Sequence, residues 1–200
     1  MSKIEPYLQH IEGICGEGGK FYKITDEGGV PPISVVAFAD VPDQGCTTAF
    51  SFGLSSIAHR EWVNSRPELV ISVNSLDSSW PLAMGELIRN GRDRCLFSYG
   101  MMLNFGQPVS DESLMSCFLV YACSVLDEGD ISVQLPDRKV QLSQLYPIFE
   151  SEMAIIKEVG VQKFVHHLGI DLFDVKRAPY SHTSPTPPTP DSERLPTPRG

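Results

Sequence analysis

Histidine is the side chain that most readily binds metals and transfers protons near neutral pH, so its spacing is the first test for chemistry. His166 and His167 are adjacent, so on a helix they point about 100° apart and cannot ligate one ion. His10 and His59 have no histidine four residues away. The spacing predicts no metal site, and we expect one of the adjacent pair to be half-buried and the other exposed.

The five cysteines are scattered along the chain without a C-x-x-C pair: Cys15, Cys46, Cys95, Cys117 and Cys123. An odd number in a chain that lacks an export signal favours reduced thiols over a disulfide framework. Cys117 and Cys123 lie beside the apolar run 118–121, where a small apolar side chain packs well. We therefore expect these two thiols to serve the core.

Two further motifs were weighed for serine hydrolysis and nucleotide binding. The segment 51–55, Ser-Phe-Gly-Leu-Ser, lacks the two glycines that flank the serine of a G-x-S-x-G nucleophile elbow. It reads as a strand end that turns at Gly53. The glycines of 16–19 lie between a predicted helix and a predicted strand, which is the reverse of a phosphate-binding loop, and no Gly-Lys-Ser/Thr follows.

Paired carboxylates, which general acid–base catalysis often uses, occur twice. Asp111 and Glu112 follow Ser110 and are typical of a turn or a cap. Glu150 and Glu152 fall in the first turn of a predicted helix, where the helix dipole favours negative charge. These patterns predict a chain with no catalytic residues and no cofactor, and an unrecognised enzyme is the alternative.

The formal charge is −9, from 16 Lys plus Arg against 25 Asp plus Glu. The charges after Ala178 cancel, so the acidic excess belongs to the part preceding it. Nucleic-acid binding needs a basic face and is disfavoured. A basic protein partner is favoured through charge steering, and solubility is the plainer explanation of the same charge.

No apolar run approaches the ~20 residues that a membrane-spanning helix needs. The first six residues, Met1 to Pro6, contain no apolar core of the signal-peptide kind. We expect a cytoplasmic protein that does not contact membranes.

The apolar pattern predicts helices and strands in separate runs, which favours an α+β domain over a doubly wound parallel fold. A first helix with Pro6 in its first turn and a capping box from Ser2 to Glu5 is followed by strands, a helix, more strands and two helices. The predicted strands are 20–25, 33–39, 46–52, 68–73, one within 96–105, 116–122, 131–135 and a short 139–142. The later helices are 78–90, one that Pro147 starts and Gly160 ends, and 161–168. We expect a mixed, mainly antiparallel sheet with helices packed against it.

The composition changes from Ala178 onward, where Pro, Ser and Thr dominate. A stretch with so little apolar content cannot offset its ordering entropy, so 178–200 is predicted to be a disordered, extended tail. Residues 185–190 satisfy the minimal P-x-x-P spacing. An inert tail, a ligand for an SH3-type domain and a site of proline-directed phosphorylation are the three interpretations.

Several segments in order resemble the suppressor-of-fused domain family. They are the strand 33–40 with Pro42, the run 47–55, the strand 68–73, Trp80-Pro81-Leu82-Ala83, 103–109, 113–115, and 145–148 with Glu150 and Glu152. The resemblance covers residues 1–177, essentially all of the predicted folded region.

The resemblance implies an α+β interaction domain without a catalytic centre. Many compact bacterial members of the family are regarded as immunity proteins that neutralise toxins. Together with the acidic charge, this points to sequestration of a protein, for which a basic toxin domain such as a nuclease is the candidate. The alternative is a regulatory adaptor without toxin involvement. The family carries over no partner-contact residue position by position, so the sequence predicts no binding face.

Overall fold

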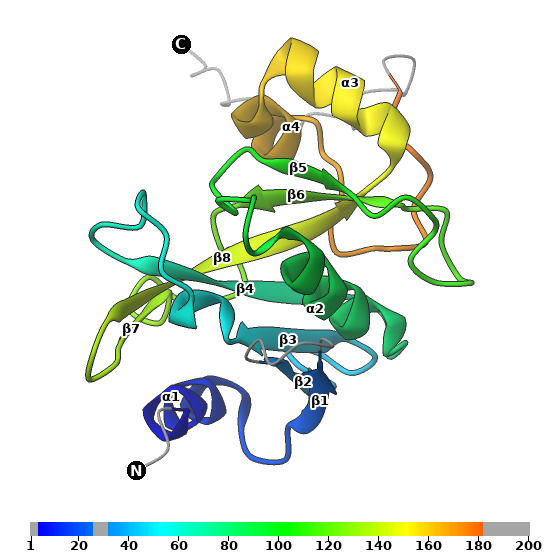
Figure 1. The fold of residues 1–200 in the computed structure, drawn as a ribbon. Coiled ribbons are helices and arrows are strands. Elements are labelled where there is room, and N and C mark those ends of the chain that lie inside the picture. Colours follow the sequence, from blue (N-terminus) through cyan, green and yellow to red (C-terminus); the bar gives the residue numbers. More distant parts are fainter. Residues whose placement is uncertain (1–3, 26–31, 182–200) are drawn as a thin grey trace, which may run out of the picture.

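The computed structural model describes residues 4–25 and 32–181 (Figure 1). The strands are β1 (Lys20–Ile24), β2 (Ile33–Ala39), β3 (Thr47–Phe52), β4 (Arg66–Val73), β5 (Met102–Asn104), β6 (Cys117–Tyr121), β7 (Ser132–Gln134) and β8 (Lys139–Ile148). The helices are α1 (Glu5–Cys15), α2 (Ser79–Gly91), α3 (Glu150–Val159) and α4 (Val161–His167), with a short 3-10 turn at Leu54–Ser56. No helix within the described ranges is both long and apolar enough to span a bilayer.

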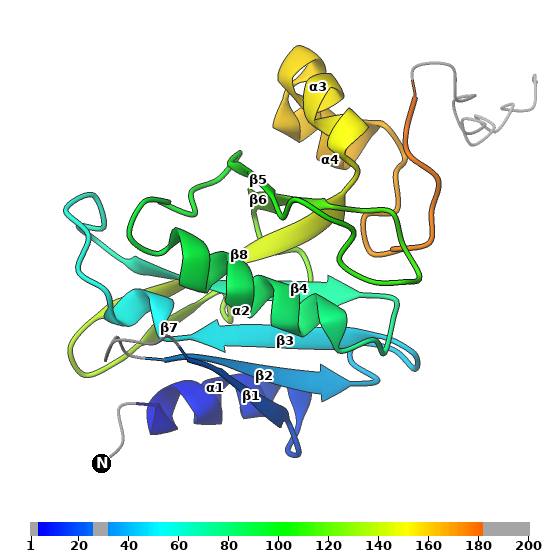
Figure 2. The same cartoon turned by 45° about the vertical axis from the view of Figure 1, so that its right-hand side comes forward.

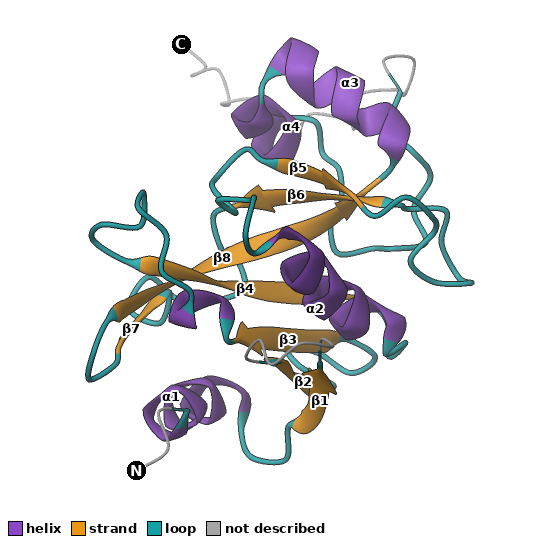
Figure 3. Ribbon diagram, in the orientation of Figure 1, coloured by secondary structure: helices purple, strands orange, loops and turns teal. Residues whose placement is uncertain are grey.

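The strands form one sheet in the order β1-β2-β3-β4-β8-β6-β5, and β7 pairs with the start of β8. Every pair is antiparallel except β4 with β8, whose parallel register runs from Arg66 opposite Val140 to Ile71 opposite Leu145. Figure 3 shows the helices lying against this sheet and not alternating singly with its strands. The predicted α+β class, with a mixed and mainly antiparallel sheet, is confirmed.

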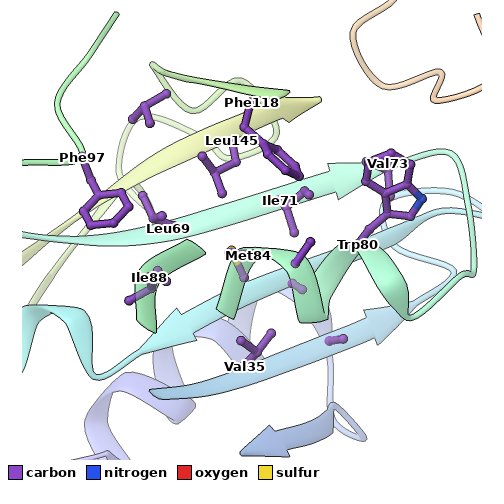
Figure 4. Packing of buried hydrophobic residues seen from close by; sticks show 14 of the residues in the cluster. Val35, Leu69, Ile71, Val73, Trp80, Met84, Ile88, Phe97, Phe118 and Leu145 are labelled. Atoms are coloured by element: carbon purple, nitrogen blue, oxygen red, sulfur yellow. The ribbon is translucent and has the colours of Figure 1, made fainter. Parts of the chain in front are cut away.

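The helix α2 covers one face of the sheet. Alternate residues of each strand point to that face, as Val35 does from β2 and Ile71 does from β4, and they meet Trp80 and Met84 of the helix (Figure 4). The helix approaches the sheet closely at Gly85, because a Cβ atom built there would lie 1.8 Å from Cδ1 of Ile24. A larger residue at this position would therefore force the end of the Ile24 side chain to move.

The opposite face carries two separate clusters. Tyr7 and Ile11 of α1 pack on Val36 and Phe50 at the β1–β4 side of the sheet, among others. The helices α3 and α4 cover the β6–β8 side, where Phe164 is fully buried with Tyr146 and Ile148 of β8. Helices thus cover both faces of the sheet.

The end of β8 differs from the prediction. The strand continues to Ile148, so the short strand 139–142 was underestimated and Pro147 does not start a helix; α3 begins at Glu150. The ladder with β4 stops at Leu145, so Pro147 has a hydrogen-bonding neighbour on one side only, opposite Phe118. An edge position of this kind tolerates a residue without an N–H. The predicted cap at Ser2, the turn 26–29 and residues 182–200 lie outside the described residues.

Candidate partner-binding surface

The serines of the 51–55 segment serve a buried carboxylate and do not form a nucleophile site. Glu68 on β4 is fully buried, and its Oε2 accepts a 2.6 Å hydrogen bond from Ser51 Oγ. Its Oε1 accepts the backbone N–H groups of Gly53 and Ser55 at 2.8 and 2.9 Å. Ser51 Oγ in turn accepts the N–H of Leu69 at 2.8 Å. Two of the segments that carried the family resemblance, 47–55 and 68–73, are therefore joined through one side chain.

Burial raises the pKa of Glu68, and the hydrogen bonds from Ser51, Ser55 and Gly53 oppose that rise. Ser51 lies in β3, and Gly53 and Ser55 belong to the turn that follows it. The carboxyl group therefore organises the backbone turn, and nothing about its surroundings exposes it to a substrate.

The carboxylates Glu150 and Glu152 differ in burial. Glu150 is exposed, whereas Glu152 is fully buried and accepts the N–H of Phe149 at 3.0 Å, which caps α3. Arg177 donates two hydrogen bonds to Glu152, at 2.5 and 2.8 Å, and the N–H of Tyr180 donates a third at 2.8 Å. Glu152 therefore fastens the chain after α4 onto α3, a structural role.

The histidine prediction was wrong in one respect. His166 and His167 are both exposed at the end of α4, because the buried side of this helix is supplied by Phe164. Within the described residues no three His, Cys, Asp or Glu side chains are placed to hold a metal ion. Cys117 is fully buried and Cys123 is partly buried against the α1 cluster, as expected of thiols that serve the core.

Acidic side chains gather at one end of the sheet, where β4 finishes and α2 begins. Four segments meet there: the β2–β3 turn, the β4–α2 connection, the 106–116 loop and the 169–176 loop, all on the right-hand side of Figures 1 and 2. We call this surface the acidic end. Its carboxylates are Asp40, Asp43, Asp77, Asp111, Glu112, Asp171 and Asp174.

Hydrogen bonds hold the four segments together. Asn74, directly after β4, donates its N–H to the carbonyl of Phe173 at 2.9 Å, which docks the 169–176 loop. Thr47 Oγ1, next to the β2–β3 turn, donates to the carbonyl of Ser75 at 2.7 Å. The hydroxyl of Ser75 donates to Glu112 and so brings in the 106–116 loop. The acidic end is thus a built feature of the fold.

The carboxylates nearest the centre of this end are kept charged. Partial burial acts to raise the pKa of Asp77, but hydrogen bonds from Ser110, at 2.5 Å, and from Ser79 lower it overall. The pKa of Glu112 is likewise lowered, since hydrogen bonds from Ser75, Lys176 and the Trp80 ring outweigh its burial. Both groups are therefore ionised throughout the physiological pH range.

Positive charge is scarce at the acidic end, and apolar side chains project from it. Lys176 forms a 3.0 Å ion pair with Glu112, while the neighbouring Arg177 is engaged by Glu152. Leu76 and Leu114 are 58% and 78% exposed and lie in two of the four segments. Exposed leucines set among carboxylates combine an apolar anchor with a charged rim, which is the arrangement of many protein interfaces.

Comparison with known proteins places this fold. The sequence profile of the suppressor of fused protein family matches residues 29–178. The chain belongs to the suppressor of fused protein family. Of the solved structures, a putative suppressor of fused homolog from Neisseria gonorrhoeae FA 1090 superposes with a TM-score of 0.70 at 17% identity, covering 90% of this chain and 97% of that one.

The chain is also similar to three further proteins. Drosophila Suppressor of Fused superposes with a TM-score of 0.66 at 13% identity over 88% of this chain, which spans half of that protein. A structure of the Sufu–Fu complex gives a TM-score of 0.64 at 15% identity, covering 88% of this chain and 91% of that one. Immunity protein YqcF of Bacillus subtilis strain 168 is 22% identical over 180 residues, 84% of this chain and 91% of its own length.

The acidic end was not predicted from the sequence. Its carboxylates come from four segments that are up to about 130 residues apart, and none of those segments is a run of acidic residues. Two signals were available in retrospect: Asp111-Glu112 beside an exposed Leu114, and Asp171 with Asp174. Only the sheet order, with β4 next to β3, shows that these pairs share one surface.

Proposed function

We propose that this chain is a non-catalytic protein-binding module that neutralises a toxin by sequestration, and that the acidic end receives a basic domain of that toxin. The observation that carries the proposal is the concentration of seven carboxylates at one end of the sheet, around two exposed leucines. A field of one sign speeds the approach of an oppositely charged partner and fixes its orientation. An apolar anchor then supplies the contact that slows dissociation.

The comparisons support a protein partner in general terms. One relative is named as an immunity protein, and a structure related to this chain contains Sufu in a complex with Fu. The side chains weighed above for catalysis have structural roles: Ser51 and Ser55 serve Glu68, and Glu152 serves Arg177. These observations favour binding over catalysis.

The direct test is rescue of growth together with binding. The chain would be co-expressed with the polypeptide encoded beside its gene, and the purified pair would be assayed for a stoichiometric complex at increasing salt. We expect the chain to abolish toxicity and the association rate to fall steeply with salt. A complex that forms equally fast in low and high salt would contradict the charge-steered interface.

Matched charge reversals locate the interface. Asp43 and Asp111 are exposed at the acidic end, and Asp127 and Glu128 are exposed on the β6–β7 connection, so Asp43→Lys with Asp111→Lys and Asp127→Lys with Glu128→Lys change the net charge equally. We expect the first pair to slow association by about tenfold or more at low salt and the second to have little effect. Equal effects of the two pairs would show that net charge matters and the acidic end does not.

A regulatory adaptor is the second candidate, because the same surface would serve a basic partner that is not a toxin. Rescue separates the two. A stable complex with a partner whose expression alone leaves growth unaffected would favour the adaptor.

A further inference from the structure

Two adjoining cavities lie at the end of the sheet opposite the acidic end. The larger has a volume of about 310 Å³ and the smaller about 150 Å³, and Trp62 and Ser65 line both. They are formed around the loop that precedes β4 and around the β7–β8 turn, on the left-hand side of Figures 1 and 2. A partner bound at the acidic end would leave them open.

The parallel pairing of β4 with β8 builds the floor of both cavities. Pro67 lies opposite Gln141, and the register places Arg66 beside Val140, directly after Lys139. The loop before β4 crosses above this floor, and Trp62 is fixed there by a 3.3 Å hydrogen bond from its Nε1 to the carbonyl of Leu96. The wall between the cavities is therefore an anchored aromatic ring.

The larger cavity is predominantly apolar. Trp62, Leu96, Phe97 and Tyr99 line it, and Tyr99 is 52% exposed. The volume is at the small end of the range for ligand pockets, large enough for one aromatic ring with its substituents. Flat apolar groups pack well against Trp and Tyr faces.

The smaller cavity is polar and positively charged. Arg66, Arg138 and Lys139 line it against a single carboxylate, Asp137. Arg138 donates to the hydroxyls of Ser55 and Ser56 at 3.2 and 2.9 Å and pairs with Asp137 at 3.0 Å.

Arg66 donates to the carbonyl of Ser55 at 3.1 Å. Hydroxyl and carbonyl partners orient the two guanidinium groups, and Asp137 offsets the charge of Arg138, so three bases against one acid leave the lining of this cavity at +2. The larger cavity is lined by one carboxylate, Glu61, so the two cavities together carry three bases against two acids, in a chain of net charge −9.

We propose that the two cavities form one binding site for an oxyanion carried on a flat apolar body, with the phosphate or carboxylate among Arg66, Arg138 and Lys139 and the body against Trp62 and Tyr99. The site is independent of the proposed toxin-binding surface. Guanidinium and ammonium groups recognise oxyanions through charge-assisted hydrogen bonds. The adjoining apolar cavity favours ligands in which the oxyanion is attached to a flat apolar group.

Phenyl phosphate is the probe, with inorganic phosphate and phenol as its two halves. Each is titrated at constant ionic strength and followed by tryptophan fluorescence and by calorimetry. We expect saturable binding of phenyl phosphate at least about tenfold tighter than of either half. Phenol that binds as tightly as phenyl phosphate, or no saturable binding of phenyl phosphate, would overturn the proposal. Phenylacetate, and a short peptide ending in Phe with a free or an amidated carboxyl, show whether the anion is preferred as phosphate or as a chain terminus.

Two variants test the two halves against a matched control. Lys139→Glu reverses an exposed charge at the smaller cavity, Lys163→Glu reverses an exposed charge on α4, and Trp62→Leu removes the shared ring. Binding should weaken by about tenfold or more in Lys139→Glu and Trp62→Leu and stay unchanged in Lys163→Glu. Equal loss in both lysine variants would mean general attraction of anions and would refute the site.

Discussion

The buried pair of Glu152 and Arg177 gives the sharpest test of what holds the domain together. Glu152 is 0% exposed and the Arg177 side chain 9% exposed, and the carboxylate accepts two hydrogen bonds from the guanidinium and one each from the N–H groups of Phe149 and Tyr180. Glu152→Ala would remove the carboxylate from a buried cation and from two backbone donors. Breaking such a pair costs about 3–5 kcal/mol.

The loss of stability is measured by urea unfolding at neutral pH, with thermal unfolding alongside. For a chain of this size each kcal/mol of lost stability lowers the midpoint temperature of thermal unfolding by roughly 2–4 °C, so we expect this temperature to drop by about 10 °C. Glu150→Ala is the control, since Glu150 is exposed two residues earlier and should change stability by no more than about 0.5 kcal/mol. Replacing both partners, as Glu152→Leu with Arg177→Met, should recover most of the loss because no charge is then left buried.

Two results would refute this reasoning. If Glu152→Ala and Glu150→Ala destabilise equally, then the pair contributes nothing beyond ordinary helix-end electrostatics. If the double replacement is as unstable as Glu152→Ala, then the cost comes from the shape of the site and not from the unpaired Arg177.

Three further predictions concern packing, pH and reactivity. Gly85→Ala should lower the free energy of unfolding in urea by about 1–3 kcal/mol, because the added Cβ would meet Ile24 at 1.8 Å. Gly13→Ala is the control in α1, where the added Cβ meets open space, and it should stabilise the protein by about 0.5–1 kcal/mol. Burial raises the folded-state pKa of Glu68 above its ordinary value of 4.5, so the contribution of its neutral form to stability is present at low pH and is lost as pH rises through the folded pKa. Glu68→Gln should remove this part of the pH dependence of urea unfolding. Burial raises the pKa of Cys123 to about 11, so disulfide-reagent labelling at pH 8 should be more than about tenfold slower folded than in urea, and a fast folded-state reaction would contradict the burial.

The order of elements could be predicted because each leaves a periodic signal in the sequence. The buried strand Ile33–Ala39 has the predicted bounds, and α2 begins and ends within one residue of its prediction. The errors occur where tertiary contacts determine the secondary structure. Pro147 reads as a helix start in isolation, but it lies in β8 because Phe118 pairs with it from one side while β4 has already ended.

The faces of the helices were harder to assign than their positions. The adjacent pair His166 and His167 was expected to split between the core and solvent. In the structure Phe164 fills the buried side of α4, and the ring of His166 lies 5.9 Å from the ring of Tyr121 while remaining exposed. One large apolar residue takes the buried position of this seven-residue helix, so both histidines stay at the surface.

The surface charge pattern depends on one topological choice that composition does not encode. The parallel pairing of β4 with β8 brings the starts of both strands to one end of the sheet, so Arg66 lies beside the Arg138–Lys139 turn. The same strand, β4, runs away from these bases and ends among the carboxylates. Had β8 run antiparallel to β4, its basic start would lie at the acidic end and neutralise part of that surface. The direction of β8 therefore separates the basic side chains from the acidic end, so that the two ends of the sheet carry opposite charge. Both proposed sites depend on this separation.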